Sequence, residues 1–188
     1  EGMRAFFARA GIRQELLQTI RNPVEPVFTS AKPPTPWMNR NFFFIGRIEP
    51  EKGYDLAAEA ARRAGVPMHF IGDGAGRPAL EQQYPEAVCH GWKDREGIRG
   101  LLAGARAVVV ASRLPEPFGL VAIEAAAGGI PVITPRAALL SPEIERIGCG
   151  ATFNDNDAAS LARLMSEFAG GDDAIRLMSA NGLRRAMS

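Results

Sequence analysis

The sequence has few residues of several types that mark particular classes of protein. Cys89 and Cys149 are its two cysteines, too few for a disulfide framework, which indicates a reducing compartment. His69 and His90 are its two histidines, and because they lie far apart without metal-ligand spacing we interpret both as structural. No apolar run approaches the length of a membrane span, and the first residues lack the pattern of a signal peptide.

An excess of charge of one sign is also missing. The 188 residues include 22 Lys or Arg and 21 Asp or Glu, which gives a formal net charge of +1. This balance provides no electrostatic basis for binding nucleic acid or an acidic membrane surface, so any bound anion requires a local arrangement of groups. The hydrophobic content of 46% is ordinary for a globular domain, and the length allows one good core with a small appendage.

A proline-rich connector separates two parts of the chain. A short helix is predicted at 3–10, with a break at Gly11. Five prolines within residues 22–36 remove backbone donors and fix φ, so this stretch is predicted as a connector. We therefore divide the chain into residues 1–38 and a domain at 39–188.

Short apolar strands and helices alternate in the second part. Strands are predicted at 42–45, 67–71, 87–90, 107–111, 130–134 and 151–153. Helices are predicted at 55–64, 77–83, 95–103, 158–168, 174–179 and directly after Gly119. This order predicts an α/β fold, with a parallel sheet covered by helices on both faces.

The most informative stretch runs from Glu116 to Glu124. A loop with Pro and Gly opens a helix at Gly119, and a Gly-Gly pair closes it. The first amides of such a helix have no internal partner and carry the positive end of its dipole, so a phosphate is expected there. Glu124 can reach back toward the helix mouth and accept hydrogen bonds from a sugar diol, and Glu116 can accept from hydroxyls on the opposite side.

Taken singly, each glutamate has a simpler explanation. Glu124 is an acid favourably placed near a helix N-terminus, and Glu116 is a solvated loop acid. Their spacing around an anion site favours the other interpretation. Together they indicate a ligand that alternates sugar, phosphate and sugar.

Loops at the carboxyl ends of parallel strands are the usual ligand sites of such folds. In the loop 46–53, Arg47 can hold a phosphate with its planar fork and Lys52 adds a compact charge. The alternative is a solvated basic loop in which Glu49 and Glu51 compensate Lys52. We favour a ligand-binding loop.

Two further loops follow later strands. Gly72-Asp73-Gly74-Ala75-Gly76-Arg77 ends in Arg where a dinucleotide fingerprint needs Gly, and it follows the second strand, which argues against a dehydrogenase. It is interpreted as a tight turn near the ligand. In the loop 89–93, Gly91 and Trp92 can present main-chain groups to a nucleobase, and a turn with a packed Trp is equally consistent with the sequence.

Two acidic clusters favour a capping role over metal binding. Asp155-Asn156-Asp157 matches the D-x-D pattern of metal-dependent sugar transferases. It precedes an apolar-periodic helix, so Asp157 is predicted as an N-cap, and Asp172-Asp173 is interpreted in the same way.

Residues 40 to about 185 resemble the C-terminal half of a retaining glycosyltransferase of the GT-B fold, in the large group called family 4 or glycosyl transferases group 1. The resemblance is carried by the motifs Gly46-Arg47 with Glu51-Lys52-Gly53, Gly72-Asp73-Gly74, the E-x7-E motif from Glu116 to Glu124, and Gly129-Ile130-Pro131-Val132. Two departures are small: Ala75 stands where many relatives carry Pro, and Gly128 doubles the glycine before Ile130.

The resemblance implies one half of a GT-B architecture, with a Rossmann-like sheet that binds the nucleotide-activated sugar. Carried over by position, Arg47 and Lys52 contact the diphosphate, Glu124 holds the ribose, and Glu116 holds the transferred sugar. Arg47, Lys52 and Glu116 are thus the expected catalytic residues. The other expected donor-binding residues are Gly46, Gly72, Gly74, Trp92, Phe118, Gly119, Leu120 and Val121.

The same resemblance extends to domain organisation. Residues 1–38 resemble the end of an N-terminal domain followed by the interdomain linker. The run at 179–182 resembles the region just before the closing helix of the family, so the chain looks cut at both ends. An N-terminal domain missing here is expected to bind the acceptor.

The expected reaction is the transfer of a hexose from a UDP or GDP sugar to an acceptor hydroxyl with retention. No metal or other cofactor is expected, because two cations and a helix dipole can stabilise the leaving diphosphate. We expect no nucleic-acid partner and a cytoplasmic location, with peripheral membrane association through the missing domain left open. This fragment alone is expected to bind the donor without turnover.

Three alternatives stay open from the sequence. The first is a sugar-nucleotide epimerase of the same architecture, and the second is a non-catalytic module that binds nucleotide sugars. The third, a single-domain flavodoxin-like regulator, is disfavoured by the paired glutamates and the basic loop. The base, the sugar and the acceptor are not determined by the sequence.

Overall fold

The computed structural model describes residues 7–17, 26–28, 33–114 and 119–186. Six parallel strands form one sheet in the order β3-β2-β1-β4-β5-β6. The strands are β1 (Asn41–Ile45), β2 (Met68–Ile71), β3 (Val88–Cys89), β4 (Ala105–Val109), β5 (Val132–Pro135) and β6 (Gly150–Phe153). The predicted parallel α/β sheet is confirmed.

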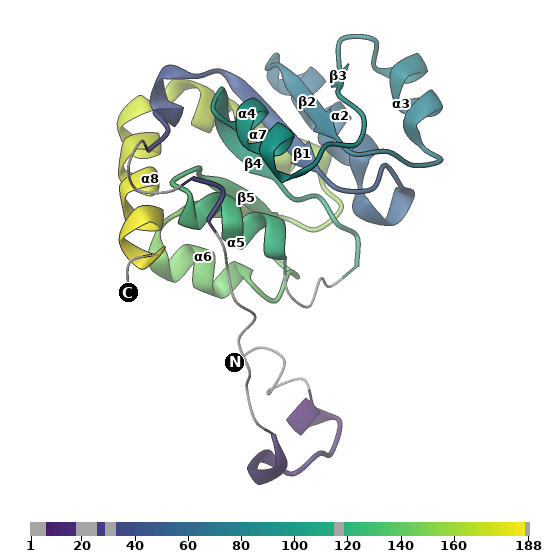
Figure 1. Ribbon diagram of the computed structural model, residues 1–188. Coiled ribbons are helices and arrows are strands. Elements are labelled where there is room, and N and C mark those ends of the chain that lie inside the picture. Colours follow the sequence, from purple (N-terminus) through teal and green to yellow (C-terminus); the bar gives the residue numbers. More distant parts are fainter. Residues whose placement is uncertain (1–6, 18–25, 29–32, 115–118, 187–188) are drawn as a thin grey trace.

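Helices connect successive strands and cover both faces of the sheet (Figure 1). The α-helices are α2 (Tyr54–Ala64), α3 (Arg77–Gln83), α4 (Arg95–Leu102), α5 (Leu120–Ala127), α6 (Ser141–Ile147), α7 (Ala158–Gly170) and α8 (Asp172–Ala186). Short 3-10 helices are η1 (Gln14–Leu16), η2 (Pro36–Met38) and η3 (Pro50–Lys52). No helix among the described residues is long and apolar enough to cross a membrane.

Side-chain alternation along the strands produces two hydrophobic cores. Phe42 and Phe44 of β1 pack with residues of α2 and α7 on one face. Phe43, between them, packs with residues of α4, α5 and α6 on the other face. Because successive strand residues point to opposite faces, the run of three phenylalanines supplies both cores at once.

Arg106 of β4 is fully buried and holds η2, which follows the proline-rich connector, against the sheet domain. Its guanidinium donates to the carbonyl oxygens of Trp37 at 3.2 Å and Asn39 at 3.0 Å, which belong to η2 and the residue after it. It also lies 2.6 Å from Oδ1 of Asp172, the first residue of α8. These bonds hold η2 in a fixed position relative to the sheet.

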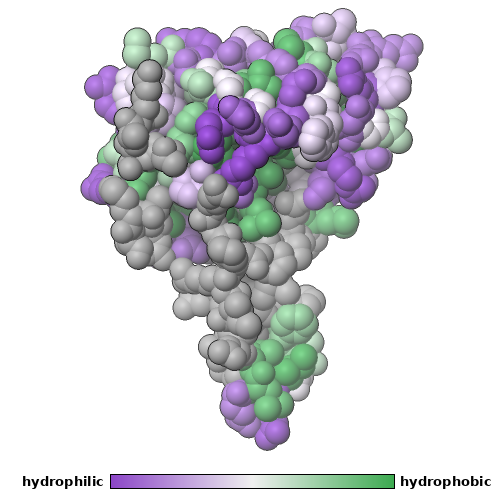
Figure 2. All heavy atoms as spheres, viewed as in Figure 1, coloured by the Kyte–Doolittle hydropathy of each residue, from purple (hydrophilic) through white to green (hydrophobic). Residues whose placement is uncertain are grey.

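The N-terminal segment 7–17 projects away from the sheet domain (Figure 1). Residues 7–9 are helical, which agrees with the described part of the helix predicted at 3–10. Hydrophobic residues appear on the surface of this segment (Figure 2), where Phe7, Ile12 and Leu16 are exposed.

Several elements differ from the prediction, and three of the differences have a clear place in the packing. β4 begins at Ala105 rather than 107, because Ala105 pairs with Asn41 and the charged Arg106 is buried within the strand. Helix α6 was not predicted. α8 extends to Ala186 rather than ending at 179. Gly182, whose run 179–182 was compared with the region just before the closing helix of the family, lies inside α8, where an added Cβ would stand 2.1 Å from the carbonyl oxygen of Ala126. Close packing of α8 on α5 thus overrides the low helix propensity of glycine.

Candidate functional site

A pocket lies at the carboxyl ends of β1 and β4, between which the order of the strands reverses. Open α/β sheets bind ligands at this point because the loops after the two strands turn to opposite sides and leave a crevice. The pocket has a volume of about 510 Å³. Its walls are the loop after β1, the loop after β4 and the first turn of α5.

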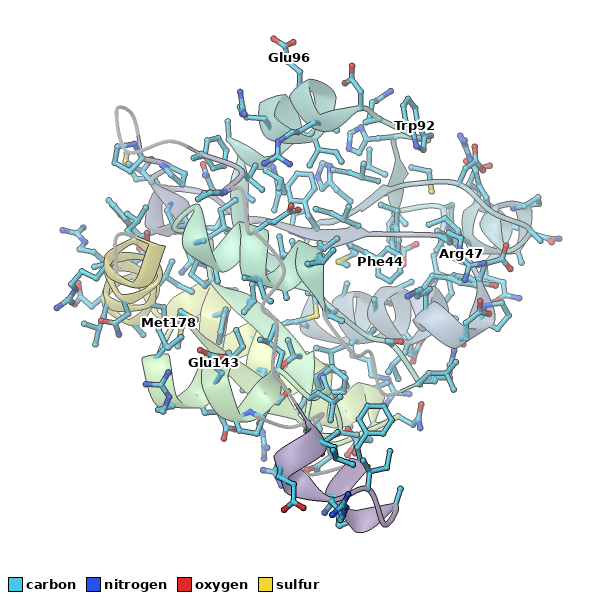
Figure 3. The ribbon with its side chains drawn as sticks, turned by 60° about the horizontal axis from the view of Figure 1, so that its bottom comes forward. Phe44, Arg47, Trp92, Glu96, Glu143 and Met178 are labelled. Carbon is cyan, nitrogen blue, oxygen red and sulfur yellow. The ribbon has the colours of Figure 1, made fainter. Side chains whose placement is uncertain are left out.

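The pocket brings together six of the residues predicted for the site. These are Gly46, Arg47, Lys52, Gly119, Leu120 and Val121. Figure 3 shows Phe44 on β1 and Arg47 beyond the end of that strand. Glu116 and Phe118 lie outside the described residues. Gly72, Gly74, Trp92 and Glu124 are not among the residues that line the pocket.

The wall contributed by α5 has the geometry of an anion site. Gly119 precedes the helix with φ of 50°, and its carbonyl oxygen accepts the amides of Ala122 and Ile123. The amides of Leu120 and Val121, in the first turn, have no acceptor within the helix. Leu120 and Val121 both line the pocket, at the end of the helix that carries the positive end of its dipole.

The opposite wall carries the two predicted cations. Arg47 Nη2 lies 3.0 Å from Oε1 of Glu51, and the two side chains are 66% and 37% exposed. An exposed ion pair of this kind contributes about 0–1 kcal/mol, so Glu51 is a weak competitor for a diphosphate. Lys52 ends η3 and lines the same wall.

Gly53 allows the turn bearing Lys52 to close against the end of β4. Its φ is 69°, and an added Cβ would stand 2.0 Å from the carbonyl oxygen of Ala111. A residue with a side chain would meet both a strained backbone and a direct clash. The glycine quoted in the sequence motif is therefore required by contact between the two loops that form the pocket.

Gly72 and Gly74 support the first loop from behind. An added Cβ at Gly72 would stand 1.9 Å from the carbonyl oxygen of Gly46, and one at Gly74 would stand 2.6 Å from that of Ile48. The amide of Ile48 donates to the carbonyl oxygen of Asp73 at 2.9 Å. These glycines bring two backbones together, and this contact positions the loop of Arg47.

Glu124 lies on α5, one turn beyond Leu120, and its carboxylate reaches toward α4. Its Oε1 lies 3.6 Å from Nη1 of Arg95, the first residue of α4. Trp92 stands three residues earlier, is 73% exposed and points outward in Figure 3. A packed tryptophan, one of the two interpretations of that loop, is thus wrong. The ring of Trp92 is thus exposed and the carboxylate of Glu124 is half-buried, and neither residue lines the pocket.

Sequence reasoning missed two arginines near the site. Arg95 also donates to the carbonyl oxygen of Pro26 at 3.4 Å, and so joins Glu124 to the segment 26–28. Arg113 follows β4 and contacts the turn of Lys52. Arg113 stands three residues before Glu116, directly after an apolar strand, and this position was a signal that could have found it.

The acidic clusters behave differently from each other. Asp157 is an N-cap, as predicted: its Oδ1 accepts the amides of Ala159 at 2.9 Å and Ser160 at 3.0 Å. These bonds, with that of Ser160 foremost, lower the pKa of the carboxyl. Asp172 is not a simple cap, because it pairs with Arg106 and with Arg40. Among the described residues, no group of three or more His, Cys, Asp or Glu is arranged to hold a metal ion.

Comparison with known sequences gives partial matches to larger proteins. The chain is 31% identical over 160 residues to glycogen synthase of Mycobacterium tuberculosis, which covers 78% of the chain and 38% of that protein. It is 36% identical over 94 residues to a GDP-mannose-dependent alpha-mannosyltransferase of the same species, covering 50% of the chain and 25% of the enzyme. An uncharacterized 41.2 kDa protein of the Klebsiella pneumoniae cps region is 32% identical over 129 residues, with 66% and 36% covered. The chain thus spans well under half of these relatives.

Solved structures share the fold. Anabaena Alr3699/HepE in complex with UDP superposes with a TM-score of 0.80 at 20% identity, covering 97% of this chain and 56% of that one. Staphylococcus aureus TarM, in a complex that includes UDP, gives a TM-score of 0.81 at 17% identity, covering 100% and 39%.

A Rossmann-like domain of the GT-B glycosyltransferase type is the class that this sheet and its neighbours define. The family model described as Glycosyl transferases group 1 matches residues 28–184. The chain belongs to this family.

Proposed function

We propose that this chain is the donor-binding part of a glycosyltransferase that moves a hexose from a nucleoside-diphosphate sugar to an acceptor hydroxyl with retention. The observation that carries the proposal is the single pocket in which Arg47 and Lys52 face the first turn of α5. Two cations opposite a helix N-terminus suit a diphosphate, and the flanking glutamates suit sugar hydroxyls. Residues 1–38 are proposed as the end of an acceptor-binding domain and its linker.

The names of similar proteins support this choice of ligand. The Anabaena protein was crystallised with UDP and with UDP-glucose, and the mycobacterial relative is named for its dependence on GDP-mannose. We propose a UDP or GDP sugar as the donor here.

The proposed mechanism places charge stabilisation on this domain. As the bond to the sugar breaks, the diphosphate gains negative charge. Arg47, Lys52 and the amides of Leu120 and Val121 are oriented toward that charge before the reaction begins, which is how a preorganised site lowers a barrier. They do the work of a divalent cation, so we propose that the transfer is metal-independent. Glu124 holds the ribose, and Glu116 is proposed to hold the transferred sugar.

The test is nucleotide binding by the 188-residue chain, measured by calorimetry with UDP, GDP and ADP. A charged hydrogen bond is worth about 1.5–3 kcal/mol, so Lys52→Ala is expected to weaken the preferred nucleotide about ten- to hundredfold. Arg163→Ala is the matched control, because it removes an exposed cation of α7 outside the pocket. Equal affinities in the Lys52 variant and the parent would count heavily against the proposal.

The two glutamates are separated by a second comparison. Glu124→Ala is expected to weaken the free nucleotide and the sugar nucleotide alike, whereas Glu116→Ala is expected to weaken the sugar nucleotide selectively. Products formed with and without an acceptor then distinguish a transferase from an epimerase. A binding module would form neither product, even when it is joined to the proposed acceptor-binding domain.

A further inference from the structure

Arg113 joins the loop after β4 to the turn that bears Lys52. Its backbone amide donates to the carbonyl oxygen of Glu51 at 2.8 Å, and its guanidinium donates to that of Pro50. The same guanidinium meets Asp55 in a fork, with Nη1 to Oδ1 and Nη2 to Oδ2 both at 2.8 Å. The contacts therefore hold the turn at Pro50 and Glu51 and the following helix at Asp55.

The fork is a strong contact for a position near the surface. Two parallel bonds to one carboxylate fix the orientation of both groups, which a lysine cannot do. Burial raises the pKa of Asp55, but the hydrogen bonds and charge of Arg113 outweigh it and bring the pKa below its ordinary value. Asp55 also lies in the first turn of α2, where a negative charge is favourable.

The position of these contacts relates them to the pocket. Ser112 and Leu114, on either side of Arg113, line the pocket from the loop after β4, and Glu51 and Lys52 line it from the adjoining loop after β1. The Ser112 hydroxyl also donates to the carbonyl oxygen of Glu51 at 3.3 Å. Arg113 itself is not in the lining, because its guanidinium is directed to Asp55. Arg113 is therefore placed to set how the loop after β4 meets the η3 turn, without contacting the ligand.

We propose that Arg113 is a positioning residue for the diphosphate, acting through Lys52. The pair of Arg113 and Asp55 keeps the η3 turn against the end of β4, so that the ammonium group of Lys52 is held toward the bound phosphates. This inference rests on the proposed function, because it assigns Arg113 to the same site.

The experiment is a double-mutant cycle on nucleotide affinity, measured by calorimetry with UDP, GDP and ADP on the 188-residue chain. Arg113→Lys is expected to weaken the preferred nucleotide about tenfold in the parent, and by less than about twofold when Lys52 is already alanine. A general structural role would weaken binding by the same factor in both backgrounds. Asp55→Asn removes the partner from the other side and is expected to reproduce the same pattern.

A matched control lies at the other end of α2. Arg62 pairs with Glu86 at 2.7 Å, outside the pocket lining, so Arg62→Lys weakens a similar ion pair and is expected to leave nucleotide affinity unchanged. Unchanged affinity in both Arg113→Lys and Asp55→Asn, or equal losses with and without Lys52, would overturn the inference alone. If the parent chain binds none of the nucleotides, the proposed function fails and this inference fails with it.

Discussion

Nδ1 of His69 lies 2.9 Å from Nε2 of His90, although His69 belongs to β2 and His90 directly follows β3. β2 and β3 are neighbours, which brings the imidazoles into a stack with ring centroids 5.2 Å apart. Phe43 lies beneath them, 4.8 Å from the ring of His69. The structural interpretation of both histidines is consistent with this arrangement, since neither lines the pocket.

The histidine pair predicts a loss of stability at mildly acidic pH. Burial, and then the charge of His90, lower the pKa of His69; burial, and then Lys93, lower the pKa of His90. The unfolded chain therefore takes up protons at these sites more readily than the folded one. Their contribution to stability is complete above the ordinary value of 6.5 and is lost as the pH falls below it.

Urea unfolding at about pH 7.5 and about pH 5.5 checks this expectation, with a lower midpoint at the lower pH. His90→Gln removes one of the two titrating groups and keeps a polar side chain, so its midpoint is expected to fall less between the two conditions. A parent midpoint that does not change with pH would show that the pair contributes nothing.

Gly53→Ala is expected to destabilise the protein by about 3 kcal/mol or more, because it combines a backbone penalty at positive φ with a clash. The clash is with the carbonyl oxygen of Ala111, 2.0 Å from the added Cβ. Gly65→Ala is the control: its φ is 66°, close to that of Gly53, and nothing lies within 4 Å of its added Cβ. It should show only the backbone penalty of about 1–2 kcal/mol in chemical denaturation. Equal losses would contradict the contact between the loops.

Arg106→Lys is expected to destabilise the protein by about 3 kcal/mol, because it leaves buried carbonyl oxygens of α7, of η2 and of the residue after η2 without their donor. Those oxygens belong to Trp37, Asn39 and Phe168. Asp172 pairs with both Arg106 and the exposed Arg40. Arg40→Lys alters only the exposed pair and should cost less than about 1 kcal/mol. Thermal and urea unfolding measure the stability of both variants. A small effect of Arg106→Lys would show that η2 is not held by this side chain.

The position of Glu124 predicts discrimination between ribose and deoxyribose. If its carboxylate accepts from the ribose hydroxyls, the preferred nucleoside diphosphate should bind about tenfold more tightly than its 2′-deoxy form. Glu124→Gln should reduce this ratio, and Arg95→Gln should reduce it less, since the ion pair between them spans 3.6 Å and Arg95 is 43% exposed. Arg99→Gln, on the same helix, serves as the control. A ratio near one in the parent would contradict the proposed role of Glu124.

Most elements of the fold could be predicted because the signals are local. The apolar run Phe42-Phe43-Phe44 is enough to predict a strand, and glycines after helices predict helix ends to within a few residues. The start of β4 could not be predicted, since nothing near Arg106 indicates that its charge is satisfied by three distant segments. Helix α6 was missed, although α3, which was predicted, likewise has seven residues, an early proline and no side-chain cap.

The site was predicted to a similar extent. The sequence identified Arg47, Lys52 and Gly119 correctly as neighbours in space, because loops at the carboxyl ends of adjacent parallel strands converge. It assigned Gly72 to the ligand, and this stays a prediction; the structure adds a tight contact of Gly72 with the backbone of Gly46 that the sequence did not indicate. The pair of Arg113 and Asp55 depends on a packing distance between two loops, which no local pattern encodes.

The pairing of β1 with β4 joins Asn41 to Ala105, across three intervening α-helices, one 3-10 helix and two strands. A growing polypeptide therefore carries the three phenylalanines of β1 on an unfinished sheet edge until β4 has left the ribosome. Pairing between such distant segments is slow compared with the formation of local helices. Because the pocket is lined by the loops after β1 and β4 and by the first turn of α5, a nucleotide can stabilise only a nascent chain that has passed this stage, and cannot assist the steps before it.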